Sequence, residues 1–492
     1  MGSRRAEFGK SAEPVSCVKG YFNWAAAGLI QGLFLKVRQE GEHLGKLFGT
    51  DGIRGEANRY PMDGAMAFSV GQALVHFLKS KSTRPQVVIG RDTRISGPML
   101  ESALVAGITS MGGDPFLTGV LPTPGIAHYS RISRFNAGIV ISASHNPYRD
   151  NGIKVFSGEG FKLSDQQEDL IEAMVLGGEL PKMVAPPHEI GESHKSDDAA
   201  DSYVEFIAQC FPSGHTAKGM KIVIDTANGA TYRVAPRVFE RLGVTTTVIH
   251  NEPNGLNIND RCGSQHTEDL QKRVVELGAD LGLAFDGDGD RLIAVDEKGR
   301  RLTGDQILVI CAKVLKREGR LKNNLLVTTV MSNLGLSVAC KRHGFVHHAS
   351  KVGDRFVLED MKRLGGALGG EESGHIIFLD HHTTGDGLLA SMQLIASVIK
   401  EGKPLSELSS LMDIYPQKLI SVSVKSKPEM SSIALVMEAI RQAEKKLGDD
   451  GRVLVRYSGT ENLCRVMVEG PTQDLTEKYC GQIADAVRTA IG

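Results

Sequence analysis

Three successive blocks of the sequence alternate short apolar runs with segments of helical periodicity. In the first block, Gln86–Gly90 and Ala137–Ser142 have the composition of buried strands, and Pro98–Met111 between them has the pattern of a helix. Each block runs for about 100–150 residues, which is the size of one domain. Strands that alternate with helices predict α/β domains on mostly parallel sheets.

The pattern changes after Tyr415-Pro416. Two predicted strands, Arg452–Arg456 and Arg465–Val468, follow each other directly, with predicted helices on either side at Ile433–Leu447 and Leu475–Ile491. This order predicts a smaller α+β domain at the C-terminal end.

These patterns divide the chain into five segments. They are an N-terminal extension (1–45), domain one (46–200), domain two (201–300), domain three (301–414) and domain four (415–492). The polar stretch from Gly177 to Asp201 is expected to be a linker. In the extension, the apolar run Trp24–Leu35 is too short to span a bilayer, and we expect no membrane partner. A passive extension and an interfacial or targeting helix both stay open.

Charge and cysteine usage limit the partners and the compartment. Lys and Arg total 57 against 58 Asp and Glu, which gives a formal net charge of −1. A chain without a large positive field is not expected to bind nucleic acid. The seven cysteines include no CxxC pair, which argues against a disulfide framework or a zinc ribbon and favours a reducing cytoplasm.

Two polar loops after predicted strands carry groups suited to catalysis. Ser144 and His145 follow the strand Ala137–Ser142. Adjacent residues in an extended segment point in opposite directions, so we do not expect His145 to act as the base for Ser144. The second loop has three carboxylates at alternate positions: Asp286, Asp288 and Asp290. Crowded carboxylates need a cation to offset their repulsion, and their hard oxygens suit Mg²⁺ or Ca²⁺.

Two further loops carry hydrogen-bonding groups. The loop Gly369–His375 offers Glu371 and Ser373, which suit sugar hydroxyls because these both donate and accept hydrogen bonds. The loop Arg456–Asn462, with Arg465 just beyond, combines guanidinium groups, hydroxyls and backbone N–H groups that suit a phosphate dianion. An ordinary turn stays the alternative for each loop.

Two glycine-containing loops lie nearer the N-terminus. The loop Phe48–Gly55 carries one cation, Arg54. For the loop Gly90–Arg94 we expect a structural network between its arginine and aspartate side chains.

The four functional loops, in this order, resemble those of the α-D-phosphohexomutase family, which are a phosphoserine loop, a metal loop, a sugar loop and a phosphate loop. The resemblance covers about Lys46 to Ile491. It implies an α/β fold of four domains around a central cleft, with three similar α/β domains on mixed sheets and a C-terminal α+β domain. SASHNPYRDNGIKVF around Ser144, NINDRCGSQH at Asn257–His266 and RYSGTENLCRVMVEG resemble the branch that acts on glucosamine phosphates.

The resemblance also implies an activity. The enzyme would be an isomerase that interconverts glucosamine 6-phosphate and glucosamine 1-phosphate through a phosphoserine and a 1,6-bisphosphate, feeding UDP-N-acetylglucosamine synthesis. A hexose 1,6-bisphosphate would be the activator, a small-molecule sugar phosphate the partner and the cytoplasm the location. A homodimer is left open. Glu372 and Asn462 stand where that branch commonly has Gln and Pro, which puts fine specificity in doubt but not the reaction.

The roles of single residues follow from the same resemblance. Ser144 would carry the phosphoryl group and would hold one Mg²⁺ together with Asp286, Asp288 and Asp290. The candidates for acid/base work are Lys154, Arg54 and His375. The expected substrate contacts are Glu371, Ser373, Arg456, Ser458, Gly459, Thr460, Arg465 and Arg291.

Three alternatives stay open. A mutase of the same family could prefer glucose or mannose phosphates. A phosphatase could use Asp286 as its nucleophile and Asp288 as its acid. A non-catalytic protein could bind sugar phosphates without turnover.

Overall fold

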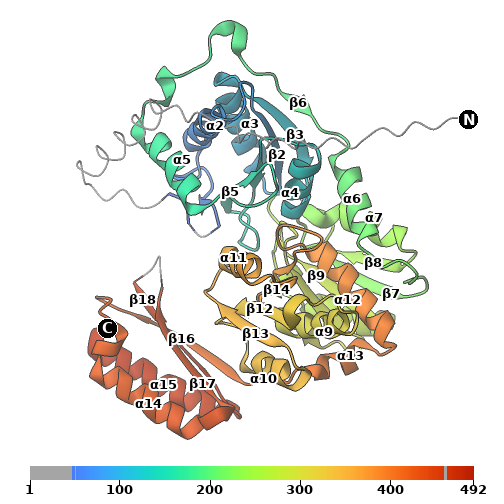
Figure 1. Ribbon diagram of the computed structural model, residues 1–492, viewed down its shortest axis with the longest axis vertical. Helices are drawn as coiled ribbons and strands as arrows, with labels where there is room; N and C mark the ends of the chain where they lie inside the picture. Colours follow the sequence, from blue (N-terminus) through green and yellow to red (C-terminus); the bar gives the residue numbers. More distant parts are fainter. Residues whose placement is uncertain (1–46, 50, 459–461) are drawn as a thin grey trace, which may run out of the picture. The chain divides into compact units, whose positions relative to one another are not determined.

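The computed structural model describes residues 47–49, 51–458 and 462–492 (Figure 1). The chain divides into two units, Met1–Gly45 and Lys46–Gly492. The predicted N-terminal extension lies outside the described residues.

Domain one is built on a six-stranded mixed sheet with the order β1-β5-β4-β2-β3-β6. The strands are β1 (Ile53–Glu56), β2 (Gln86–Arg91), β3 (Asp114–Val120), β4 (Ala137–Ile141), β5 (Asp150–Ser157) and β6 (His194–Lys195). The helices are α2 (Gly64–Leu78), α3 (Gly97–Ser110), α4 (Thr123–Ile132) and α5 (Asp165–Gly177). β4, β2, β3 and β6 are parallel, whereas β5 runs antiparallel to both β4 and β1. The loop with Ser144 therefore joins two neighbouring antiparallel strands.

Domain two has a five-stranded sheet with the order β11-β10-β9-β7-β8. Its strands are β7 (Lys221–Asp225), β8 (Thr245–Ile249), β9 (Leu281–Phe285), β10 (Leu292–Asp296) and β11 (Arg301–Leu302). Its helices are α6 (Ala199–Gln209), α7 (Val234–Arg241) and α8 (Glu268–Leu277). β9 and β10 are antiparallel, and the three aspartates lie in the turn between them.

Domain three has a four-stranded sheet with the order β13-β12-β14-β15. Its strands are β12 (Leu325–Thr329), β13 (Val346–Ser350), β14 (Leu368–Gly370) and β15 (Ile376–Phe378). Its helices are α9 (Gly304–Arg317), α10 (Leu334–His343), α11 (Asp354–Leu364), α12 (Gly387–Glu401) and α13 (Leu405–Leu408). The predicted sugar loop is the turn between β14 and β15.

Domain four is an α+β unit with the antiparallel sheet β16-β18-β17. It contains β16 (Gln417–Ser423), α14 (Ala434–Leu447), β17 (Arg452–Tyr457), β18 (Leu463–Glu469) and α15 (Gln473–Ile491). Short 3-10 helices across the second unit are Leu180–Lys182, Pro187–Glu189, Ala230–Tyr232, Gly263–Gln265, Lys322–Asn324, Ser409–Leu411, Met430–Ser432 and Gly448–Asp450.

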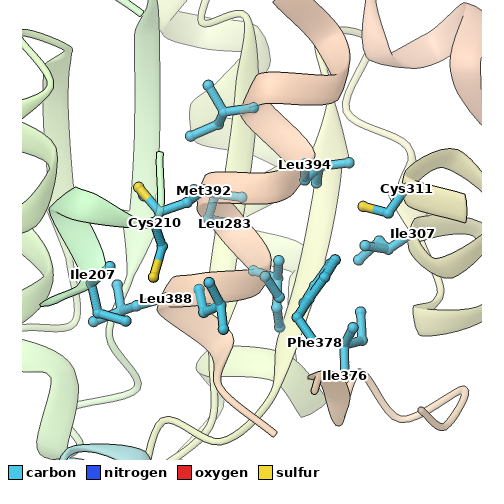
Figure 2. Packing of buried hydrophobic residues seen from close by; sticks show 14 of the residues in the cluster. Ile207, Cys210, Leu283, Ile307, Cys311, Ile376, Phe378, Leu388, Met392 and Leu394 are labelled. Carbon is cyan, nitrogen blue, oxygen red and sulfur yellow. The ribbon is translucent and has the colours of Figure 1, made fainter. Parts of the chain in front are cut away.

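One apolar core runs through domains one, two and three. It includes Ile126 of α4, Leu283 of β9 and Leu388 of α12. Figure 2 shows Leu388 and Met392 of α12 on the side of Ile207 and Cys210, and Leu394 on the side of Ile307 and Cys311 of α9. The first eleven residues of α12 are all buried. Domain four has an apolar cluster of its own, formed by α14, α15 and the sheet. The serine, metal and sugar loops are thus supported by a shared core.

The prediction of a linker over 177–201 is wrong in part. The segment contains two 3-10 helices and β6, whose backbone pairs with β3, and α6 begins at Ala199. Its few apolar side chains hide this structure, because a two-residue edge strand needs only backbone pairing. The three α/β domains have mixed sheets, as the resemblance implied: parallel pairs form the middle of each sheet, and antiparallel pairs are added towards one edge. Among the described helices, none combines the length and apolar character needed to cross a bilayer.

Candidate active site

Ser144 lies at the turn between β4 and β5 and is buried. Its backbone has φ +52°, a left-handed conformation that is uncommon for serine. In this conformation Ser144 Oγ donates a hydrogen bond to Asp286 Oδ2 at 2.5 Å. The structure thereby brings the predicted phosphoserine together with the first aspartate of the predicted metal loop.

The expectation that the side chains of Ser144 and His145 point in opposite directions is wrong. Ser144 Oγ lies 3.3 Å from His145 Nδ1, because the left-handed backbone turns both side chains to one side. Burial, then the charges of Arg291 and Arg54, lower the pKa of His145 to about 4. A neutral imidazole therefore faces the serine hydroxyl at neutral pH.

The three aspartates of the metal loop are buried and close together. Oxygens of Asp286, Asp288 and Asp290 all lie within 4.8 Å of one another. Oδ1 of Asp288 and Oδ1 of Asp290 are buried and have no hydrogen-bond partner among the described residues. Unpartnered carboxylate oxygens are costly to bury, and hard oxygen donors suit a divalent cation. The donor set therefore fits a metal ion held by the triad with Ser144 beside it.

Thr123 of domain one holds Asp288, one member of the aspartate triad of domain two. Its backbone N–H donates to the Asp288 carbonyl at 2.9 Å, and its hydroxyl donates to Asp288 Oδ2 at 2.7 Å. Domains one and two therefore meet inside the metal loop.

Lys154 extends from β5 into the same carboxylates. Its Nζ lies 2.9 Å from Asp288, 3.1 Å from Asp51 and 3.7 Å from Asp290. Burial alone would lower the pKa of Lys154, but these carboxylates outweigh it and raise the pKa above the ordinary value. The side chain is therefore an ammonium ion, which can donate a proton or stabilise a negative charge.

Lys154 is one member of a closed ring of alternating charges that joins domains one, two and three. It runs through Lys154, Asp51, Lys162, Asp354, His375 and Asp290 and back to Lys154. Within it, Lys162 Nζ lies 2.5 Å from Asp354, and His375 lies 3.5 Å from both Asp354 and Asp290. We call this set the charge ring. Burial alone would lower the pKa of His375, but Asp290 and Asp354 outweigh it and raise the pKa, which favours the protonated imidazole. With His375 protonated, opposite charges alternate and each buried charge has partners on both sides.

Asp51, Lys162 and Asp354 of the charge ring were not predicted as site residues. Asp51 belongs to the Phe48–Gly55 loop, where only Arg54 was singled out. Lys162 and Asp354 are 192 residues apart, and no local spacing relates them. Their single sequence signal is a charged residue in each of two glycine-containing turns, Gly160–Lys162 and Gly353–Asp354.

A cavity of about 470 Å³ opens beside the triad. Its lining comes from domains one, two and three and includes Arg54, Arg291, Glu371 and His375. Nε of Arg54 and Nε of Arg291 are buried without a hydrogen-bond partner among the described residues. A larger cavity of about 580 Å³ shares Asp354 and His375 but lacks Arg54, Arg291 and Glu371. The smaller cavity therefore has the better chemistry for a sugar phosphate.

The sugar loop is held against the metal loop by backbone contacts. Arg291 and His375 form an isolated antiparallel bridge, and Leu292 N–H donates to the Gly374 carbonyl at 3.0 Å. Gly374 has φ +93°, and a Cβ there would lie 2.2 Å from the Leu292 carbonyl oxygen, so only glycine fits. Ser373 Oγ is buried without a hydrogen-bond partner among the described residues, which leaves it for a ligand hydroxyl.

Glu371, the other predicted sugar contact, faces the cavity. Gly353 N–H donates to its Oε1 at 3.2 Å. Burial is the largest influence on its carboxyl and raises the pKa above the ordinary value.

In domain four the strand register sets two arginines against each other. Arg456 of β17 pairs directly with Arg465 of β18. Burial first, then the charge of Arg465, lower the pKa of Arg456. Like charges on facing strands destabilise a sheet, so an anion between them would be stabilising. Lys427, which the sequence did not indicate, donates to the Ser458 carbonyl at 2.9 Å. Gly459 and Thr460 lie outside the described residues.

Comparison with known proteins matches four regions of the chain to the four domains of phosphoglucomutase/phosphomannomutase. Alpha/beta/alpha domains I, II and III match residues 45–181, 201–299 and 303–415, and the C-terminal domain matches residues 419–486. The chain belongs to the phosphoglucomutase/phosphomannomutase family. The expected four-domain α/β fold of the phosphohexomutases is thereby confirmed, and a metal cofactor at the triad fits this family. The exact domain boundaries stay a prediction.

Members of this family are similar to the chain over nearly its whole length. A curated relative named phosphoglucosamine mutase from Syntrophobacter fumaroxidans is 66% identical over 449 residues, which are 91% of this chain and 100% of the relative. The solved structure of a phosphoglucomutase/phosphomannomutase family protein from Burkholderia thailandensis has a TM-score of 0.74 at 25% identity and covers 90% of this chain and 97% of that one.

N-acetylphosphoglucosamine mutase from Aspergillus fumigatus, solved with GlcNAc-6P and magnesium, has a TM-score of 0.63 at 16% identity. The match covers 94% of this chain and 99% of that one. At this identity the likeness concerns the fold alone.

Proposed function

We propose that this protein is a phosphoglucosamine mutase that interconverts glucosamine 6-phosphate and glucosamine 1-phosphate. The observation that carries the proposal is the 2.5 Å contact between Ser144 Oγ and Asp286 Oδ2 of the aspartate triad, whose Asp290 lines the cavity that also contains Arg54 and Arg291. The 66% identity to a relative of that name supports the choice of sugar. The product would feed UDP-N-acetylglucosamine synthesis.

The first half-reaction transfers a phosphoryl group from Ser144 to the sugar. The bond between serine Oγ and phosphorus breaks while a bond between O1 and phosphorus forms, which gives the 1,6-bisphosphate. The O1 hydroxyl loses one proton, and serine Oγ gains one. Arg54, Lys154 and His375 are the candidates for moving this proton, since they belong to the cavity lining or the charge ring. Arg291 would stabilise the charge on the phosphoryl oxygens.

The second half-reaction returns the 6-phosphoryl group to Ser144, so the bisphosphate must turn end over end. The turn requires a clamp that accepts either phosphate. We assign this clamp to Arg456, Ser458, Gly459, Thr460 and Arg465 of domain four. Glu371 and Ser373 would hold the sugar hydroxyls in both orientations, because each can exchange hydrogen bonds with more than one hydroxyl.

The metal would be one Mg²⁺ held by Asp286, Asp288, Asp290 and the phosphorylated Ser144. Bound there, Mg²⁺ would neutralise charge that develops on the transferring phosphoryl group. A hexose 1,6-bisphosphate is the proposed activator, because it can phosphorylate a serine that has lost its phosphoryl group.

Six described cysteines are buried free thiols, which supports a reducing, cytoplasmic location. We propose no nucleic-acid or membrane partner, and a homodimer stays open.

The test is turnover measured by phosphorus NMR. The protein is incubated with Mg²⁺, a trace of hexose 1,6-bisphosphate and, separately, the 6-phosphates of glucosamine, glucose and mannose. We expect the 1-phosphate to form fastest from glucosamine 6-phosphate and a Ser144→Ala variant to be inactive. Faster turnover of glucose or mannose phosphate would contradict the proposed sugar. Inorganic phosphate released by an active Ser144→Ala variant would instead favour a phosphatase with Asp286 as nucleophile.

A further inference from the structure

A loop of domain two reaches the backbone of the reactive serine. Asn259 Nδ2 donates hydrogen bonds to the Ser144 carbonyl at 2.9 Å and to the Asn146 carbonyl at 3.0 Å. One side-chain amide from a different domain therefore binds both carbonyl oxygens that flank His145. None of the predicted catalytic or substrate-binding roles uses this contact.

Arg94 of domain one donates to the same two carbonyls. Its guanidinium lies 3.2 Å from the Ser144 oxygen and 2.5 Å from the Asn146 oxygen. Arg94 is fully buried, and it pairs with Asp92, which also accepts a hydrogen bond from Ser142. The predicted structural network of this loop is thereby confirmed. Two domains converge on two carbonyl oxygens.

The serine backbone needs such support. A left-handed conformation is unfavourable for a residue other than glycine, and it persists only where surrounding contacts fix it. Ser144 has φ +52°, and this conformation directs Oγ toward Asp286. Donors on the following carbonyls stabilise the turned backbone, so they also fix the direction of the hydroxyl.

The loop that carries Asn259 is itself anchored. The buried carboxylate of Asp225 accepts hydrogen bonds from Ala227 N–H and Gly263 N–H, each at 2.8 Å. Asn259 N–H donates to the Ala227 carbonyl at 2.9 Å. Asn259 also has a left-handed backbone, with φ +58°, which asparagine tolerates better than most residues. The backbone that carries the Asn259 amide is therefore fixed, and the amide can hold the Ser144 loop in place.

We propose that Asn259 is a positioning residue for phosphoryl transfer, which holds the Ser144 backbone so that Oγ stays aimed at the metal triad. The proposal rests on the proposed function and adds a residue to its machinery. Asn259 lies outside the lining of the 470 Å³ cavity and outside the domain-four clamp. Its loss should therefore lower kcat and leave the KM for the sugar phosphate nearly unchanged.

The test compares two variants with two matched controls. Asn259→Asp keeps the shape but loses the donor, and Asn259→Gly loses the donor without adding charge while tolerating the left-handed backbone. Asn323 in domain three is the control site: it has φ +55°, and its Nδ2 donates to the carbonyls of Leu364 and Gly365. We expect both Asn259 variants to lose roughly 100-fold in kcat, the scale of misplacing a reacting group by about 1 Å. Asn323→Asp and Asn323→Gly should behave as wild type.

A second measurement does not depend on activity. Hydrogen exchange by mass spectrometry reports opening of the peptide that contains Ser142–Pro147. Exchange there should speed up in Asn259→Gly and stay at the wild-type rate in Asn323→Gly. An unchanged exchange rate, an unchanged kcat, or a change confined to KM would overturn the proposal. If the wild-type protein turns over none of the sugar phosphates, the proposed function fails, and the exchange comparison still decides whether Asn259 positions the loop.

Discussion

The ammonium of Lys154 lies 2.9 Å from Oδ2 of Asp288, so a strand of domain one supplies a cation to the metal loop of domain two. Lys154 is almost fully buried, as is Asp288. Breaking a buried ion pair leaves an uncompensated charge and costs about 3–5 kcal/mol. The stability of the fold thus depends on the Lys154 ammonium, which lies beside the aspartate triad, where phosphoryl transfer also needs positive charge.

Lys154→Met should lower the free energy of unfolding by about 3–5 kcal/mol in the absence of divalent cations, because the buried carboxylate of Asp288 loses its nearest cation. Added Mg²⁺ should recover part of this loss, and it should raise the stability of the variant more than that of the wild type. Urea unfolding with and without Mg²⁺ measures both effects. Lys322→Met is the control, since Lys322 pairs with Asp380 on the surface and its loss should cost under about 1 kcal/mol. Equal losses in the two variants would contradict the structural role of Lys154.

Removal of divalent cations should abolish mutase activity without unfolding the protein. The charge ring still supplies Lys154 to the carboxylates when no metal is bound, and the shared apolar core is unaffected. Treatment with a chelator, followed by circular dichroism and a mutase assay, checks this expectation. Activity should return with Mg²⁺. Loss of the folded signal together with activity would show that the metal is structural.

Substitutions of two arginines on β17 should separate phosphate binding from folding stability. Arg456 faces Arg465, whereas Arg452 pairs with the buried Glu469 at 2.6 Å and donates to the Ser332 carbonyl at 2.7 Å. Arg456→Ala should raise KM by about 10–100-fold, the value of charge-assisted hydrogen bonds to a phosphate, and should not lower stability. Arg452→Ala should lower stability, because it leaves a buried carboxylate without its cation.

Steady-state kinetics and thermal unfolding of both variants check this pair. The KM effect of Arg456→Ala should exceed that of any active Ser144 variant, since Ser144 carries the chemistry and not the distal phosphate. An unchanged KM in Arg456→Ala would count against the clamp in domain four.

The sequence predicted those parts of the site that are contiguous in the chain. Ser144 and the three aspartates lie in turns between strands, so local polarity after an apolar run was enough to find them. Arg456 and Arg465 were grouped because they lie close together in the chain, and their direct pairing across β17 and β18 comes from the structure. The three α/β domains came from the alternation of strands and helices, domain four came from the change of pattern after Tyr415-Pro416, and the four-domain arrangement was implied by the family resemblance.

The sequence did not predict what depends on distant pairing or on backbone conformation. Lys162 meets Asp354 and Asn259 meets Ser144 across domains, and no spacing in the chain encodes either contact. The left-handed backbone of Ser144 could not be inferred from its residue type, and this is why the geometric argument about His145 failed. β5 was not predicted either, because polar residues interrupt its apolar pattern although two of them, Asn151 and Lys154, are buried.

The stability of the protein should depend on pH through a carboxyl group away from the metal triad. Asp305, at the start of α9, is fully buried; burial first and then the charge of Glu372 raise its pKa to about 7. In the unfolded chain the same carboxyl has a pKa near 4. Between these two values the folded state binds more protons, so stability falls as pH rises. The contribution of protonated Asp305 to the free energy of unfolding is fully present below about pH 4 and is lost as pH rises through 7.

Asp305→Asn removes this titration and keeps an oxygen to accept the hydrogen bond from Asn333 N–H, which is 2.7 Å long. From pH 5 to pH 8 the wild type should therefore lose about 2–3 kcal/mol more unfolding free energy than the variant. Urea unfolding at the two pH values gives the difference, in which titrations common to both proteins cancel. Asp360→Asn is the control: hydrogen bonding from Arg363 lowers the pKa of Asp360 to about 2, so its contribution is lost only below about pH 4. Equal losses in the wild type and Asp305→Asn would mean that Asp305 is already ionised at pH 5.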